Sequence, residues 1–224
     1  MIHVKNLSKE YSSGRGRIKA LSDVSIDIEG SKTVVVIGKS GSGKTTLLNC
    51  IGGLEKPDRG SISCFGVDIN ALSGKNLSLF QREKVGFVFQ QGNLISYLNV
   101  FDNIDFPLAL NGINGKKRKG RVLELLDKIG LAGAGKALPF ELSGGEIQRV
   151  SFARAIAHSP KMLLADEPTA SLDSETGRNL IKLMHEVSTE HKCIMVISTH
   201  DLEITELANV IIQLRDGMVI GVDQ

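Results

Sequence analysis

Tryptophan is absent from this sequence, and aromatic residues make up only 4% of it. Long apolar runs are absent as well, because no stretch approaches the ~18 residues that a helix needs to span a bilayer. The first residues alternate between apolar and polar side chains and show no apolar segment of a signal peptide. If the protein works at a membrane, we therefore expect a partner to hold it there.

Cysteine is scarce, and its placement excludes two classes of protein. The three cysteines, Cys50, Cys64 and Cys193, lie far apart and form no CxxC pair. This pattern predicts reduced thiols in a cytosolic protein, without a disulfide framework or a structural zinc site.

An excess of charge of either sign is also missing. The 27 basic and 25 acidic residues leave a net charge of +2, which is too small to indicate nucleic acid as the main partner. With 42% apolar and 23% charged residues, the composition is ordinary for a soluble globular protein. Its 224 residues suffice for one or two domains.

The glycine-rich stretch GKSGSGKT at residues 38–45 is the strongest feature that the sequence does contain. The β-branched run at 33–37 before it predicts a buried strand, and the segment 46–51 after it predicts a helix. Between a strand and a helix this motif binds phosphate, because glycines let successive backbone N–H groups converge on an anion at the helix N-terminus. The alternative is a glycine-rich turn that binds nothing.

The phosphate interpretation gives each residue of this stretch a role. Lys44 is expected to bridge the β- and γ-phosphates of a nucleoside triphosphate, and the Thr45 hydroxyl to ligate Mg²⁺. The other residues predicted to surround the phosphates are Gly38, Lys39, Ser40, Gly41, Ser42, Gly43 and Thr46.

Alternating segments near the N-terminus predict an antiparallel sheet. Residues 2–7 and 24–28 have the pattern of half-buried strands, and residues 61–65 predict a further strand of the same sheet. The glycine-, serine- and arginine-rich residues 12–17 are expected to form a loop. Tyr11 lies just before this loop, where its ring is a candidate for stacking on an adenine; a packing role is the alternative.

Polar side chains follow two of the predicted buried strands. Gln90 follows the strand at 85–89, and its amide is suited to reach Mg²⁺ or an attacking water; a solvent-facing loop glutamine is the alternative. Asp166 and Glu167 follow the strand at 161–165. Asp166 is expected to hold Mg²⁺, usually through water, and Glu167 to polarise the attacking water as a general base.

His200 follows a third buried strand, at 193–198. A lone histidine is usually structural, but the carboxyl ends of parallel strands are where α/β proteins place ligand contacts. The chain then ends in a predicted hairpin at 210–222, turning at Asp216 and Gly217.

The region between about residues 92 and 159 has a helical character. The stretch 94–108 is unusually apolar for a loop-rich segment, so we expect part of it to be core and the rest to form a docking groove. The basic run 116–121 opens a helix that ends at Gly130. This run predicts a solvated face, with a site for anionic lipid or nucleic acid as the alternative.

The sequence LSGGE at 142–146 directly precedes another predicted helix. Ser143 and Glu146 fit a capping box, so a plain helix start is one interpretation. However, Gly144 and Gly145 in the first turn cost helix stability, about 1 kcal/mol each. They favour a site where an anion closely approaches the backbone N–H groups at the helix N-terminus.

Taken in order, these motifs resemble those of the ATPase domains of ABC transporters. The resemblance covers the whole chain and includes GKSGSGKT, LSGGE, the strand that ends in Asp166-Glu167, SLD at 171–173 and His200. It implies a single α/β domain with a P-loop NTPase core. The core would cover residues 1–91 and 160–224 and include an N-terminal antiparallel β subdomain. An α-helical subdomain would be inserted at 92–159.

The resemblance also implies roles for individual residues. Tyr11 would stack on the adenine of ATP, and Ser143, Gly144 and Gly145 of the signature motif would contact the γ-phosphate, with Asp173 beside them. The implied catalytic set is Lys44, Gln90, Glu167 and His200, and the implied ligands of Mg²⁺ are Thr45, Gln90 and Asp166.

The implied function is ATP hydrolysis by a homodimer that forms head-to-tail around two ATP molecules. It would drive a separate permease, docked near 94–108, at the cytoplasmic face of the inner or plasma membrane. A regulator that acts on a cell-wall hydrolase through a membrane partner is one alternative. The other is a soluble ABC ATPase of DNA repair or translation, which usually carries insertions that are lacking here.

The segment 87–95 narrows the resemblance to a class within the family. It is similar to the lipoprotein-releasing, macrolide-export and antimicrobial-peptide-resistance ATPases, and the cell-division ABC ATPase is similar too. Two residues depart from these relatives: Lys39 stands where they usually carry proline, and Glu146 replaces the commoner glutamine. Neither departure removes a group that the chemistry needs.

Overall fold

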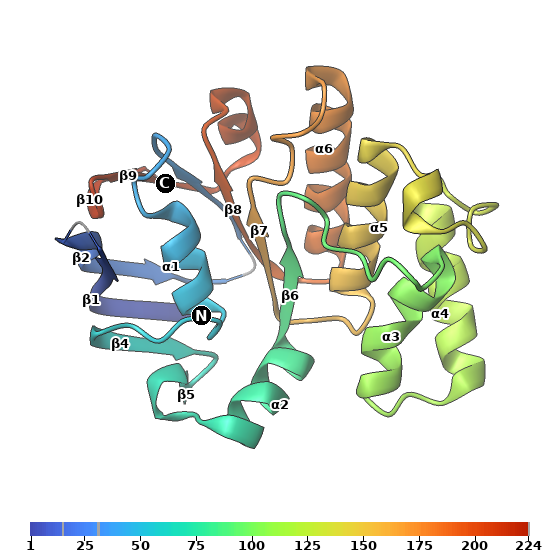
Figure 1. Cartoon of the computed structure of the whole chain (residues 1–224), viewed down its shortest axis with the longest axis horizontal. Helices are drawn as coiled ribbons and strands as arrows, with labels where there is room; N and C mark the ends of the chain where they lie inside the picture. The colour runs from blue at the N-terminus through green and yellow to red at the C-terminus, as the bar shows by residue number, and fades with distance from the viewer. Residues whose placement is uncertain (15, 31, 224) are drawn as a thin grey trace. The chain divides into compact units, whose positions relative to one another are not determined.

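A computed structural model describes residues 1–14, 16–30 and 32–223 of the chain. The chain divides into two compact units, one formed by Met1–Gln81 with Ile194–Gln224 and the other by Arg82–Cys193 (Figure 1). The boundaries predicted for the helical subdomain, residues 92 and 159, both fall inside the second unit.

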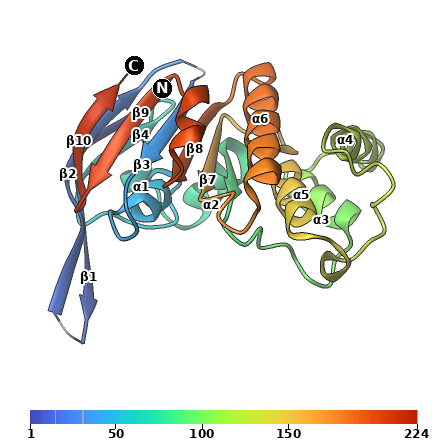
Figure 2. The same ribbon diagram turned by 90° about the horizontal axis from the view of Figure 1, so that it is seen from above.

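The first unit contains the predicted antiparallel sheet, in the order β2-β1-β4-β5. Its strands are β1 (Ile2–Ser13), β2 (Gly16–Ile28), β4 (Arg59–Cys64) and β5 (Val67–Asp68). The prediction of a loop at 12–17 is wrong, because Ser12 pairs with Arg17 and the strands β1 and β2 continue as a long hairpin (Figure 2). Glycine in this stretch allows a tight turn as readily as a loop; Arg15 lies outside the described residues.

Parallel strands in the same unit carry the phosphate loop. Strand β3 (Thr33–Ile37) pairs in parallel with β8 (Ile194–Thr199) and with β9 (Val210–Arg215). Strand β10 (Met218–Asp223) forms the predicted hairpin with β9. The three central valines of β3 are fully buried, and each contributes about 1.5–3 kcal/mol through burial. A buried strand therefore fixes the point from which the loop at 38–43 starts.

Helices follow the strands of the first unit. The short helix α1 (Lys44–Ile51) begins where the phosphate loop ends, as predicted, and α2 (Gly74–Lys84) continues into the second unit. Two 3₁₀ turns, Ile69–Ala71 and Leu202–Leu207, complete the connections.

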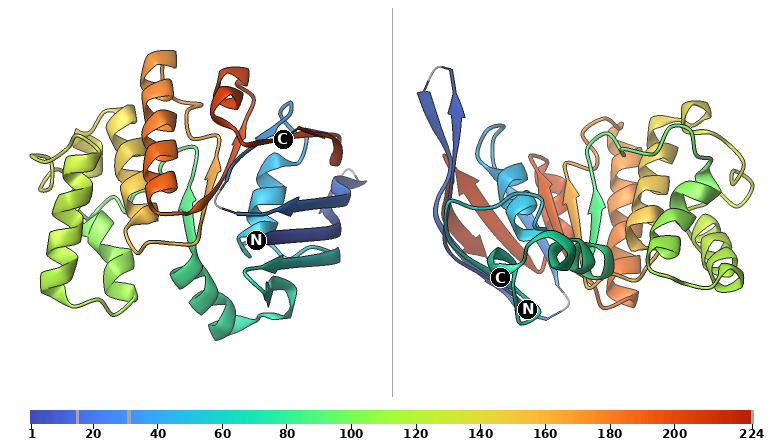
Figure 3. Two further views of the ribbon diagram at one scale, coloured as in Figure 1. Left: turned by 180° about the vertical axis from the view of Figure 1, so that it is seen from behind. Right: turned by 60° about the horizontal axis from the view of Figure 1, so that its bottom comes forward.

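The second unit contains two parallel strands and four helices. Strand β6 (Val85–Val88) pairs with β7 (Met162–Asp166). The helices are α3 (Val100–Leu110), α4 (Gly115–Lys128), α5 (Gly144–Ile156) and α6 (Ser174–Glu190), with a 3₁₀ turn at Pro139–Glu141 (Figure 3). Helix α5 packs against β6, and α3, α4 and α5 contact one another. Within the apolar stretch 94–108, helix starts at Val100 and continues through Pro107.

No helix in the described part of the chain is long and apolar enough to cross a membrane.

Candidate functional site

The phosphate loop has no room for side chains at two of its glycines. A Cβ atom at Gly38 would overlap the carbonyl oxygen of Leu214, and one at Gly43 would overlap that of Ala20. Gly43 also has φ +103°, which L side chains rarely adopt, and it is the residue from which α1 starts. The loop backbone is therefore packed tightly against neighbouring backbone at both glycines.

Lys44 lies within this loop rather than in solvent. Its side chain is buried, with the residue 5% exposed, and its Nζ donates to the carbonyl oxygens of Gly38 (2.8 Å) and Lys39 (3.3 Å). The Ser42 hydroxyl is buried too and has no hydrogen-bond partner among the described residues. A glycine cradle, an ammonium group and a buried hydroxyl together fit an anionic ligand such as a phosphate chain.

The first turn of α1 supplies no acidic side chain to the positive end of the helix dipole. Gly43 supplies no side-chain cap either. Thr45 in this turn is exposed, whereas Thr46 is buried. The positive end of the helix dipole is thus not neutralised by an acidic side chain of its own first turn.

His200 borders the same cavity as the phosphate loop. This cavity, of about 630 Å³, is lined by Gly38–Ser42 on one side and by His200, Leu202 and the residues 213–216 on another. The structure therefore brings the predicted histidine to the predicted phosphate site within the first unit.

Tyr11 is held by Thr46 and by two residues that the sequence patterns do not single out, Glu55 and Lys9. Its hydroxyl donates to Glu55 and lies 3.3 Å from Thr46 Oγ1, in the first turn of α1. The ammonium group of Lys9 lies 5.5 Å from the ring centroid. Burial, followed by the hydrogen bond to Glu55, raises the pKa of Tyr11 to about 12. The ring is neutral, oriented at three points and still 36% exposed, as a stacking role requires.

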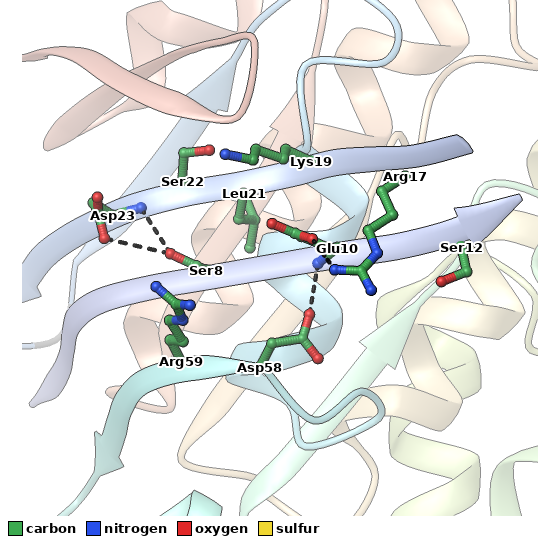
Figure 4. Close-up of a pocket in the computed structure, with 10 residues that line it drawn as sticks. All are labelled: Ser8, Glu10, Ser12, Arg17, Lys19, Leu21, Ser22, Asp23, Asp58 and Arg59. Atoms are coloured by element: carbon green, nitrogen blue, oxygen red, sulfur yellow. Dashed lines mark hydrogen bonds and ion pairs between the residues drawn. The ribbon is translucent and has the colours of Figure 1, made fainter. Parts of the chain in front are cut away.

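A second cavity lies on the antiparallel sheet and is separate from the phosphate loop. Figure 4 shows its ten lining residues, which come from β1, β2 and the segment at Asp58-Arg59. Three basic side chains (Arg17, Lys19 and Arg59) are matched by three acidic ones (Glu10, Asp23 and Asp58). The balance of charge gives this cavity of about 530 Å³ no net attraction for a phosphate chain.

In the second unit, the predicted polar residues meet at one edge of the β6–β7 pair. Val88 is paired with Ala165, so Asp166, the last residue of β7, and Gln90, two residues after β6, lie at the carboxyl ends of adjacent parallel strands. Asp166 and Glu167 are half-buried, and Gln90 is exposed. Glu167 has φ +45°, which is uncommon for a residue with a side chain.

The signature motif forms the capping box that its sequence predicts. Ser143 Oγ accepts from the backbone N–H of Glu146 (3.4 Å), and the Glu146 carboxylate accepts from both the backbone N–H (2.8 Å) and the hydroxyl (2.7 Å) of Ser143. These hydrogen bonds hold the pKa of Glu146 below its usual range.

Gly145 packs against the helix that Asp173 caps. A Cβ atom at Gly145 would lie 2.7 Å from Thr176 Cγ2, whereas one at Gly144 would meet nothing closer than Leu172 Cδ2 at 3.7 Å. Asp173 accepts from the backbone N–H of Thr176 (2.9 Å) at the start of α6. The structure thus brings Asp173 and the signature motif together, and it gives Gly145 a packing reason besides access for an anion.

The predicted docking segment exposes part of its apolar surface. Tyr97 is 82% exposed and Phe106 and Leu110 are exposed, whereas Leu98 and Phe101 are half-buried. Phe140, just before the signature motif, is 79% exposed and was not predicted as part of this surface. These exposed apolar side chains are candidates for an interaction surface if they form one contiguous patch.

Comparison with known proteins agrees with this geometry. The family model described as ABC transporter matches residues 21–170. The macrolide export ATP-binding/permease protein MacB of Neisseria meningitidis is 40% identical over 222 residues, which cover 99% of this chain and 34% of MacB. The ABC transporter ATP-binding protein YtrE of Bacillus subtilis is 39% identical, covering 99% of this chain and 97% of YtrE. The chain therefore spans about a third of the MacB proteins and nearly all of YtrE.

Solved structures confirm the predicted fold class. The dimeric ATP-binding cassette MJ0796 in a post-hydrolysis state with ADP and Pi is 38% identical and superposes with a TM-score of 0.93. The match covers 100% of this chain and 98% of that one. The α/β fold, the binding of nucleotide and the ATPase activity expected from the motifs follow from these relationships.

Proposed function

The chain belongs to the ABC transporter family, and on that premise we propose that it is the ATP-hydrolysing subunit that drives a separate membrane permease. The observation that carries the proposal is the phosphate loop, in which the buried ammonium group of Lys44 lies inside a cradle of glycines. The relatives named as a macrolide exporter and as an ABC transporter ATP-binding protein support a role in transport of the export or mechanotransmission type.

In the proposed reaction, Lys44 and the backbone N–H groups at the start of α1 bind the β- and γ-phosphates of ATP. Glu167 accepts a proton from the attacking water, and Gln90 and His200 orient the water and the γ-phosphate. The ring of Tyr11 binds the adenine by stacking. Positioning and charge stabilisation supply most of the catalysis in phosphoryl transfer.

The residues proposed to hold Mg²⁺ are Thr45, Gln90 and Asp166. A hydroxyl, an amide oxygen and a carboxylate are the hard oxygen ligands that Mg²⁺ takes together with substrate phosphates. When bound, the ion neutralises charge that develops on the β- and γ-phosphates.

We propose a head-to-tail dimer because the chain has two glycine-rich helix starts suited to phosphate, at Gly43 and at Ser143. The Ser143, Gly144 and Gly145 of one copy would cap the γ-phosphate of ATP held by the Lys44 loop of the other, with Asp173 at the same edge. The γ-phosphate then favours the closed dimer through contacts that ADP lacks. A dimeric structural neighbour supports this assembly.

Glu167→Gln tests the chemistry, because the amide keeps the shape of the side chain and loses the base. We expect ATP binding to persist and Mg²⁺-dependent hydrolysis to fall by about 10²–10⁴-fold. Turnover at the wild-type rate would contradict the assignment of the base.

Light scattering with ATP on the same variant tests the dimer. Glu167→Gln should dimerise with ATP and remain monomeric with ADP, and the double variant Glu167→Gln/Ser143→Arg should fail to dimerise. If the double variant dimerises as well as the single one, the signature motif is not the second half of the ATP site.

The exposed aromatics at Tyr97 and Phe106 support docking of the permease on the segment 94–108, at the cytoplasmic face of the membrane. Tyr97→Asp and Leu98→Asp should reduce the fraction of the chain that sediments with membranes of its own cells and leave ATPase activity in solution intact. Tyr97 is well exposed, so its variant separates a docking role from misfolding. Unchanged sedimentation of both variants would contradict this part of the proposal.

A further inference from the structure

The loop that carries Gln90 is fastened to the helix that starts at the signature motif. Gln148 of α5 donates through Nε2 to the carbonyl oxygens of Phe89 (3.1 Å) and Gln90 (2.5 Å). Arg154, two turns further along α5, donates to the carbonyl oxygens of Gly92 (2.9 Å) and Asn93 (2.8 Å). The backbone between 89 and 93 is therefore bonded to α5 at both of its ends.

Packing reinforces these hydrogen bonds. Gly92 has φ +71°, and a Cβ atom there would lie 2.6 Å from Ile147 Cγ2 of α5. Gln148 is 1% exposed, and its Oε1 has no partner among the described residues, so only its donor side is used. A buried acceptor without a partner carries a cost. The amide nevertheless takes the orientation in which its Nε2 donates to two consecutive carbonyl oxygens of the Gln90 loop.

From this geometry we infer that Gln148 and Arg154 are positioning residues, which hold Gln90 in a fixed place relative to Ser143. The inference rests on the proposed function and extends it. A helix is stiff over this length, so a displacement of Ser143 and its neighbours on binding a γ-phosphate carries the backbone of Gln90 with it. Gln148 and Arg154 touch no substrate in this arrangement and act only through the loop.

Hydrogen exchange tests the fastening without any nucleotide. In Gln148→Leu, the backbone carbonyls of Phe89 and Gln90 lose their donor, and we expect amide exchange in the segment 89–93 to become about tenfold faster. The Gly92 amide, which donates to Phe89 O (2.9 Å), is the most direct reporter.

Gln81→Leu is the matched control. Gln81 Nε2 also donates to two consecutive carbonyl oxygens, those of Gly52 (3.3 Å) and Gly53 (2.9 Å), but in the other unit. This variant loses the same chemistry elsewhere, so exchange at 89–93 should stay at the wild-type rate. Equal exchange at 89–93 in wild type and Gln148→Leu would overturn the fastening.

Steady-state kinetics test the consequence for Gln90. We expect Gln148→Leu to lower kcat about tenfold with little change in KM, since ATP binding depends on the Lys44 loop. In a Gln90→Ala background the same substitution should have no further effect on kcat, because its target is already gone. Additive losses in the double variant would overturn the positioning role and leave Gln148 as a packing residue.

Arg154→Lys keeps the inference testable if Gln148→Leu does not fold. Lysine retains the charge and loses the planar fork that reaches two carbonyls at once. It should speed exchange at Gly92 and Asn93 and lower kcat in the same Gln90-dependent way. Wild-type exchange together with a wild-type kcat in this variant would contradict the inference. A wild-type chain without ATPase activity would instead overturn the proposed function, while exchange at 89–93 still decides the fastening.

Discussion

The helices α1 and α5 both begin at glycine-rich motifs proposed to meet phosphate, but their first turns are built in opposite ways. Helix α1 starts from Gly43, in a left-handed conformation, without an acidic residue in its first turn. Helix α5 starts from Ser143 in a complete capping box, with Glu146 bonded to the Ser143 backbone N–H and hydroxyl. The first turn of α1 thus contains no anion of its own, and that of α5 already contains one.

This difference assigns different tasks to the two motifs. At α1 the glycine loop is tightly packed and holds the Lys44 ammonium group, so this helix start is suited to tight phosphate binding by a single copy of the chain. At α5 the backbone N–H and the hydroxyl of Ser143 already donate to the Glu146 carboxylate, so a γ-phosphate bound there as proposed would compete with that carboxylate for the same donors. We therefore expect weaker phosphate binding at α5 than at α1, which suits the proposed contact that forms with ATP and opens after hydrolysis.

The strongest way to break the comparison is to remove the charge at α1. Lys44→Ala deletes the ammonium group that bonds to Gly38 O and Lys39 O and that would stabilise the phosphates. We expect ATP hydrolysis to fall by about 10²–10³-fold, the effect of losing one essential donor to the transition state. Binding of a fluorescent ATP analogue to the monomer should be lost as well.

Ser143→Ala is the corresponding change at α5, and it should leave binding of the analogue to the monomer intact while weakening ATP-dependent dimerisation. Equal losses of monomer binding in the two variants would mean that the two helix starts do not have separate tasks.

Replacing one glycine at the start of each helix compares how much α1 and α5 depend on glycine for the stability of the fold. Gly43→Ala forces a side chain into φ +103° and against Ala20 O, so we expect unfolding to become easier by at least about 1–3 kcal/mol. Gly144→Ala adds a methyl group in a helical first turn, where its nearest neighbour, Leu172 Cδ2 at 3.7 Å, is at an ordinary contact distance, and we expect a gain of up to about 1 kcal/mol. Chemical denaturation of both variants measures the difference. A Gly144 variant as unstable as the Gly43 variant would refute this contrast.

The smallest expected effect comes from removing the anion at α5. Glu146→Gln in the Glu167→Gln background should raise the affinity of the ATP-dependent dimer about two- to fivefold, because a single charge at a helix N-terminus is worth about 0.3–1 kcal/mol. Titration of the dimer by light scattering measures it. A weaker dimer would show that the carboxylate helps the γ-phosphate contact.

The Glu146 cap should also make the stability of the fold depend on pH, and Glu146→Gln tests this. The pKa of Glu146 is lower in the folded chain than in the unfolded one, so its cap stabilises the fold fully above the unfolded pKa, about 4.3, and this stabilisation is lost as the pH falls through the folded pKa. Wild type should therefore unfold at a slightly higher temperature than Glu146→Gln at neutral pH and at the same temperature in strong acid. A constant difference at all pH values would contradict this assignment.

Much of the fold was predictable because local patterns decide it. The β-branched run 33–37 is a strand since its side chains are buried on both faces, and the capping box at Ser143 and Glu146 starts a helix where its sequence says. Helix α2 gave no comparable signal, because Phe80 is its only buried residue and its apolar periodicity is weak. The hairpin at 12–17 was mistaken for a loop for a related reason, since small and polar residues fit either structure.

The motif residues of the candidate site could be proposed from the sequence, but the residues that hold them in place could not. Glu55 bonds to Tyr11 across 44 positions of the chain, and Gln148 reaches the Gln90 loop across 58. Contacts over such separations leave no local spacing to detect, so they need the folded structure. The alternation that places Lys9 on the Tyr11 face of β1 is the one signal that was available.

Glu167 carries a consequence for how the sequence can change over time. Its φ of +45° costs a residue with a side chain about 1–3 kcal/mol, and glycine would avoid that cost. Selection for a stable fold therefore favours glycine or asparagine at position 167, whereas the proposed role as general base favours a carboxylate there. A lineage that stopped hydrolysing ATP would gain stability by giving up this glutamate. A glutamate kept at this position against that cost is what the proposed role as general base predicts.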